Sequence, residues 1–92
     1  MKIRVHFTAQ LRTSIGRSSD ELELPDGSNV SALIELLAAR FAEARPHLLT
    51  ADGQPHRSLL IVVNDSAIAP AAGSAKLSEG DSVTLLPPVA GG

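Results

Sequence analysis

The chain has 92 residues, a length that supports one small domain with a single hydrophobic core. Apolar residues make up 43% of it and charged residues 20%, proportions that are typical of a folded domain and exclude an extensively disordered chain. The net charge of −2, with scattered Lys and Arg, argues against a nucleic-acid-binding surface, and the lack of cysteine excludes disulfides, thiolate nucleophiles and Cys-ligated metals.

The N-terminal quarter of the sequence predicts a β-hairpin. Residues 2–8 alternate between apolar and polar side chains, which is the period of a half-buried strand. A polar stretch around Gly16 separates them from residues 21–24, which alternate in the same way and predict the second strand. The apolar positions of the two segments are Ile3, Val5, Phe7, Leu22 and Leu24.

A helix is predicted next, beginning after Ser28 or Asn29 and ending by about residue 44. Either side chain can cap the helix by accepting a hydrogen bond from an amide of its first turn. Pro46 cannot continue a helix interior and disfavours helical geometry at the residue before it. The apolar residues recur three or four positions apart and form one stripe facing the sheet: Val30, Leu33, Ile34, Leu37 and Phe41.

The second half of the sequence predicts three strands. Leu48 and Leu49 form a short turn, an exposed loop follows to residue 58, and residues 59–64 are apolar on both faces, which predicts a strand covered on both sides. Residues 66–69 predict a short edge strand, and residues 82–86, after a Gly-Asp turn, the last one.

A helix that joins an early hairpin to later strands predicts an α+β fold of the β-grasp kind. We expect a mixed sheet of four to five strands with one main helix packed on one face. This single domain should span residues 1–86.

The last six residues, Pro87-Pro88-Val89-Ala90-Gly91-Gly92, predict an extended tail that stands clear of the domain. Successive prolines favour an extended path, and glycines can enter a channel too narrow for side chains. The terminal carboxyl is an anion at neutral pH and a poor electrophile. A partner using ATP could convert it to an acyl-adenylate, from which a sulfur nucleophile would displace AMP and leave a thiocarboxylate. The alternative is an inert, frayed end.

These residues resemble the MoaD/ThiS-like ubiquitin-like sulfur carriers, most of all the small subunit of molybdopterin synthase. Leu86 to Gly92 carry most of the resemblance, supported by residues 7–12, 62–64 and 77–83. Leu85 and Leu86 stand where some relatives have aromatic residues, and the segment 45–58 is longer than theirs.

The resemblance implies that an adenylating, ubiquitin-activating-like enzyme activates Gly92 and that a donor protein supplies the sulfur. The tail, Pro87 to Gly91, would then insert into the large subunit of molybdopterin synthase, within a heterotetramer, where the sulfur builds the dithiolene of molybdopterin. The chain would bind no cofactor itself, because ATP is used by the activating partner. It would be the sulfur-donating subunit of a sulfurtransferase and would not be catalytic alone.

Three alternatives stay open at this stage. The sulfur could instead serve thiamin or cysteine biosynthesis, the tail could be joined to lysines as a protein modifier, or the domain could be a β-grasp interaction module with an inert tail. Deleting Gly92 would leave the function of such a module intact.

Further candidate residues lie on the predicted strands. Leu60, Val62 and Leu86 would form a docking patch if they lie on the open sheet face, with Arg12 and, more weakly, Lys76 adding charge. The histidines lack metal-ligand spacing and are interpreted as surface or loop residues: His6, His47 and His56. No signal peptide or membrane span is predicted, so we expect a cytoplasmic protein that binds neither nucleic acid nor membranes.

Overall fold

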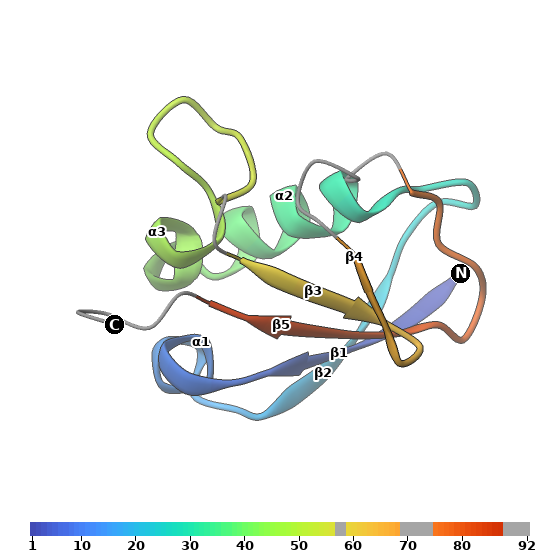
Figure 1. The fold of residues 1–92 in the computed structure, drawn as a ribbon, viewed down its shortest axis with the longest axis horizontal. Helices are drawn as coiled ribbons and strands as arrows, with labels where there is room; N and C mark the ends of the chain where they lie inside the picture. The colour runs from blue at the N-terminus through green and yellow to red at the C-terminus, as the bar shows by residue number, and fades with distance from the viewer. Residues whose placement is uncertain (57–58, 69–74, 88–92) are drawn as a thin grey trace.

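The computed structural model of the protein describes residues 1–56, 59–68 and 75–87. Its elements are β1 (Lys2–Phe7), α1 (Ala9–Ile15), β2 (Ser19–Glu23), α2 (Val30–Arg40), η1 (Ala42–Ala44), α3 (Arg45–Leu48), β3 (Leu60–Val63), β4 (Ser66–Ile68) and β5 (Ser82–Leu86). The strands form one mixed sheet in the order β2-β1-β5-β3-β4, and α2 lies across one of its faces (Figure 1). The predicted β-grasp fold is confirmed.

The central strand of the sheet is β5. It pairs in parallel with β1 and antiparallel with β3, while β2 and β4 form the two edges. Because side chains alternate along each strand, one face presents residues such as Ile61, Val83 and Val5, all fully buried. The other face, called here the open face, carries the side chains of the residues that alternate with these along each strand.

The core lies between α2 and the buried face of the sheet. The predicted helical stripe is confirmed, since Val30, Leu33, Ile34 and Leu37 are fully buried. Phe41 follows the helix and packs edge-on against Phe7, with ring centroids 6.2 Å apart. Besides the four helical residues and Phe7, the apolar residues below one tenth exposure include Ile3, Leu11, Leu22, Leu48, Leu49, Leu59, Leu77 and Leu85.

The chain after α2 differs from the prediction. The helix ends at Arg40, within the predicted limit of about residue 44, but Pro46 does not terminate it. This proline lies in the first turn of α3, where an N–H is not needed for an intrahelical bond. Arg45 has αR geometry although it precedes the proline. Leu48 and Leu49 are buried, as their predicted turn implied, and the loop after them includes the exposed Asp52.

Two other expectations need correction. The polar stretch after β1 contains the helix α1, with Leu11 fully buried and Gly16 in left-handed geometry (φ 85) at its end. The strand β3 is not covered on both sides, because Leu60 is 45% exposed. The predicted edge strand is confirmed as β4, which follows a two-residue turn with positive φ at Asn64 and Asp65.

The start of α2 provides a first test of the local structure. Of the two predicted caps, Asn29 is the one used: its side-chain oxygen accepts a hydrogen bond from the Ala32 amide at 2.9 Å. We expect Asn29→Ala to lower the free energy of unfolding by about 1 kcal/mol, because that amide loses its partner. Asn29→Asp keeps the acceptor and should unfold at nearly the wild-type urea concentration. Equal unfolding of all three proteins would contradict this role.

Candidate functional site

The strand β5 ends beside α1 and leads in the sequence into the predicted tail (Figure 1). The Thr8 hydroxyl donates a hydrogen bond to the Leu85 carbonyl at 3.1 Å and so ties the start of α1 to this strand. Pro87 is buried, so this proline packs on the domain and is not part of a segment that stands clear of it. The rest of the predicted tail, Pro88, Val89, Ala90, Gly91 and Gly92, lies outside the described residues.

The three apolar strand residues proposed for docking meet on the open face. Leu60 pairs directly with Leu86 across β3 and β5, and Val62 follows two positions along β3 on the same side. Leu60 is 45% exposed, whereas Val62 and Leu86 are half-buried. These three residues are called the apolar patch below. It lies at the root of the tail, since Leu86 immediately precedes Pro87.

The charged residues predicted to support the patch lie elsewhere. Arg12 is exposed on α1 and lines a pocket of about 470 Å³ whose other walls include His47 of α3. Lys76 forms an isolated bridge with Asn29 at the start of α2. The structure therefore does not place Arg12 or Lys76 on the strands that carry the apolar patch.

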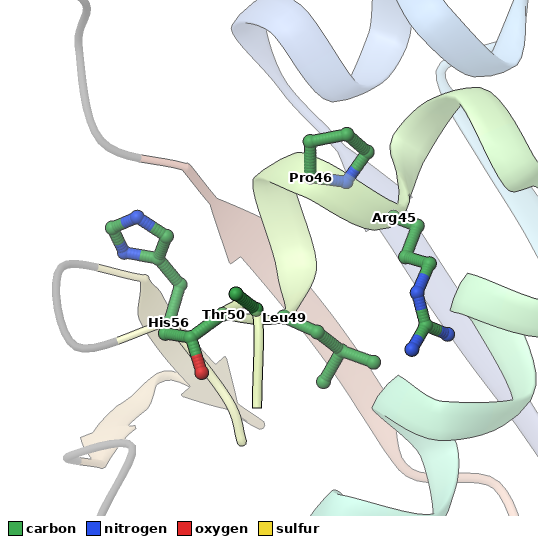
Figure 2. Close-up of a pocket in the computed structure, with 6 residues that line it drawn as sticks. Arg45, Pro46, Leu49, Thr50 and His56 are labelled. Carbon is green, nitrogen blue, oxygen red and sulfur yellow. The ribbon is translucent and has the colours of Figure 1, made fainter. Parts of the chain in front are cut away.

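A second pocket, of about 550 Å³, is formed by α3 and the segment that follows it. Arg45, Pro46, Leu49, Thr50, Ala51 and His56 line it, and in Figure 2 Leu49 lies between Arg45 and His56. The Thr50 hydroxyl donates to the carboxylate of the fully exposed Asp52, and this hydrogen bond holds the pKa of Asp52 below its ordinary value. Sequence reasoning assigned no site to this pocket, because its residues come from segments interpreted as a helix end, a short turn and an exposed loop.

The histidines are placed apart from one another. The His6 ring nitrogen Nε2 lies 3.1 Å from the Ser82 hydroxyl on the open face, while His47 and His56 line the two different pockets. No group of three metal-ligating side chains occurs within residues 1–56, 59–68 and 75–87. In that same part of the chain, none of the helices is long and apolar enough to cross a bilayer.

Known proteins are similar to this chain in sequence and in fold. The ThiS family matches residues 5–92. The sulfur carrier protein CysO of Mycobacterium tuberculosis is 38% identical over 69 residues, which cover 72% of this chain and 74% of CysO.

Among solved structures, SAMP1 from Haloferax volcanii has a TM-score of 0.88 with 100% of both chains covered, and at 20% identity it shows the fold alone. A putative molybdopterin converting factor, subunit 1, from Pyrococcus furiosus has a TM-score of 0.77 and 27% identity, covering 97% of this chain and 99% of that chain. A chain of the Amycolatopsis orientalis BexX/CysO complex has a TM-score of 0.70 and 29% identity, covering 98% and 99% respectively.

Proposed function

The chain belongs to the ThiS family, and from that premise we propose that it is a sulfur carrier whose sulfur is held as a thiocarboxylate on Gly92. The observation that supports this most is that the family match includes both the β-grasp domain and the terminal block as far as Gly92. The fold suits the role because the central strand β5 leads into the buried Pro87. The last five residues therefore start from a fixed point on a packed domain.

In the proposed reaction the chain supplies the acyl group and partner enzymes supply the catalysis. The Gly92 carboxylate attacks the α-phosphorus of ATP, which forms an acyl-adenylate and releases pyrophosphate. Hydrosulfide delivered by a donor protein then attacks the acyl carbon, and the bond from that carbon to the AMP oxygen breaks, with the electron pair leaving on AMP. Loss of the S–H proton leaves a thiocarboxylate. ATP is bound by the activating enzyme, so this chain is not catalytic alone.

We further propose that the apolar patch is the surface on which the activating enzyme docks. Leu60 is the one large apolar residue that the described part of the chain leaves exposed, and a solvent-exposed apolar side chain gains free energy when a partner covers it. Its cross-strand neighbour Leu86 lies one residue before Pro87. An enzyme that covers this pair therefore also lies at the root of the tail.

The carriage of sulfur is tested by the intact mass of the protein. The chain is purified from its native cell, or incubated with its activating enzyme, ATP and a sulfur donor. We expect a mass gain equal to the replacement of one oxygen by sulfur, located in the C-terminal peptide. A protein that never gains this mass under either condition is not a sulfur carrier.

For the destination of the sulfur, we propose molybdopterin, with the loaded tail docking into the large subunit of a molybdopterin synthase. The likeness to the Pyrococcus furiosus chain described as a putative molybdopterin converting factor supports this, because it covers nearly the whole of both chains. The second candidate is another recipient, such as the thiamin or cysteine pathway or the lysines of other proteins. The higher identity to CysO favours this second candidate.

One assay separates these destinations. The loaded protein is mixed with the large partner that co-purifies with it and with the cyclic pyranopterin precursor. Formation of molybdopterin, together with loss of the added sulfur mass from the carrier, supports the first destination. Sulfur that stays on the carrier while the precursor is unchanged favours the second.

A further inference from the structure

Basic residues gather at the end of the sheet where β1 and β5 finish. Arg12 lies on α1, Arg40 ends α2, and Arg45 and His47 lie on α3; these four residues are called the basic cluster. The elements that carry them pack together, because η1 contacts α1, α2 and α3. The three arginines are exposed, and none has a carboxylate within ion-pair distance in residues 1–56, 59–68 and 75–87. Glu43 is the one acidic residue of α1, η1 and α3.

Acidic side chains gather at the other end. Asp26 lies 3.5 Å from the Met1 amino group, and Glu79 accepts from the Lys2 amide at 3.1 Å. Asp81 accepts from Asn64 at 2.7 Å, just before β5 begins. Since β1 and β5 run in parallel, this acidic end lies at the starts of both strands, and the basic cluster lies beyond their ends. The length of β1 separates the two by about 16 Å.

The chain therefore carries exposed arginines at one end of the sheet, while its other end carries acidic side chains together with the Met1 amino group and Lys2. Its net charge is −2, so the positive charge near the tail is a local property and is not shared by the whole protein. A protein with such a charge distribution turns its positive end toward an acidic partner during approach, and charged patches of this kind raise association rates. The end that is steered inward is the one that carries the tail.

We propose that the basic cluster docks on an acidic protein surface around the entrance through which the activating enzyme receives the tail. This inference rests on the proposed function. A nucleic acid fits the cluster less well, because the chain offers no exposed aromatic ring for base stacking: Phe7 is 2% exposed and Phe41 is half-buried against it. A small anion also fits less well, because Arg12 and Arg45 line different pockets and do not converge.

The test compares two double variants with the same change in net charge. R12E/R45E reverses two charges in the basic cluster, whereas K2E/K76E reverses the two lysines, which lie outside it. The activating enzyme is purified by following its ATP-dependent reaction with this chain. It is then assayed by ATP–pyrophosphate exchange with the wild type and each variant as carrier, at low and high salt. Circular dichroism and thermal unfolding confirm that both variants are folded.

We expect R12E/R45E to raise the KM for the carrier by on the order of tenfold at low salt, with kcat nearly unchanged. The increase should shrink at about 0.5 M NaCl, because salt screens exposed charges. K2E/K76E should change the KM less than about twofold, since its charges lie away from the contact.

Several outcomes would overturn the inference. An equal rise of KM in both variants would show an effect of net charge alone, and an unchanged KM in R12E/R45E would remove the docking contact while leaving the sulfur-carrier proposal intact. Retention of the wild type, but not of R12E/R45E, on immobilised poly(U) RNA with equal KM values would assign the cluster to nucleic acid. A wild-type chain that is never adenylated would overturn the proposed function and this inference with it.

Discussion

A chain that lacks Gly92 is expected to take up no sulfur, although its fold is unchanged. Deletion moves the terminal carboxylate back by one residue, or about 3.4 Å, whereas misplacing reacting atoms by about 1 Å can already cost a hundredfold in rate. The buried apolar core lies between Ile3 and Leu85, so its packing is not touched. Intact mass after incubation with the activating enzyme, ATP and sulfur donor measures the loading, and thermal unfolding checks the domain.

Two further variants sharpen this test. Adding one alanine after Gly92 should also abolish loading, because the carboxylate then lies beyond the reacting atoms. Ala90→Ser keeps the length of the tail and should load at close to the wild-type rate. Normal sulfur uptake by the shortened and the lengthened chains would refute carriage at Gly92.

Ile61→Ala should mainly lower the stability of the domain, whereas Leu60→Ala at the neighbouring position should mainly weaken partner binding. Ile61 is fully buried beneath α2, so Ile61→Ala is expected to lower the free energy of unfolding by about 2–5 kcal/mol, a large share of the stability of a small domain. Leu60 is 45% exposed, so Leu60→Ala should cost less than about 1 kcal/mol in stability. It should instead weaken binding to the activating enzyme by about tenfold or more, as expected for a central apolar contact.

Urea unfolding and titration calorimetry with the activating enzyme measure the two effects separately. Glu23→Ala is a suitable control on the open face, because Glu23 is an exposed residue of the edge strand β2, and β1 lies between β2 and β5. This variant should bind nearly as tightly as the wild type. If Leu60→Ala binds at full strength, the apolar patch is not the docking surface.

The regular elements of this fold could be predicted because their signals are local. The stripe on α2 follows from spacing alone, and the alternation along β1 shows which side of the strand is buried. The end of α2 could not be read in this way. Pro46 is compatible with a first helical turn as well as with a chain break. The residue that predicted the end of one helix therefore lies in the first turn of the next, α3.

The helix α1 was missed because its N-cap residue forms no capping hydrogen bond within the helix. Thr8 stands at the N-cap position, but its hydroxyl bonds to the Leu85 carbonyl and not to an amide of the helix. Leu11 and Ile15, four residues apart and followed by Gly16, were the signal that could have revealed the helix. Its first residue, Ala9, has a φ of 50, and no sequence pattern predicts this geometry for an alanine.

The candidate site was predictable only in part. Apolar character on both sides of β3 was read as burial on both sides, but it reflects an open face that keeps Leu60 exposed. Whether Leu60 and Leu86 meet depends on the register of β3 and β5, which long-range pairing fixes. The basic cluster was not foreseen, because its arginines come from three helices and two of these helices, α1 and α3, were not predicted.

Because Pro87 is buried, the length of chain from it to Gly92 limits how deep the catalytic atom can lie in any enzyme that acts on Gly92. Gly92 lies five residues beyond this proline, and five fully extended residues span at most about 18 Å. A catalytic atom that meets Gly92 can therefore lie no deeper than this below the surface that touches the carrier. Enzymes of unrelated folds that act on it in turn must share that limit on depth.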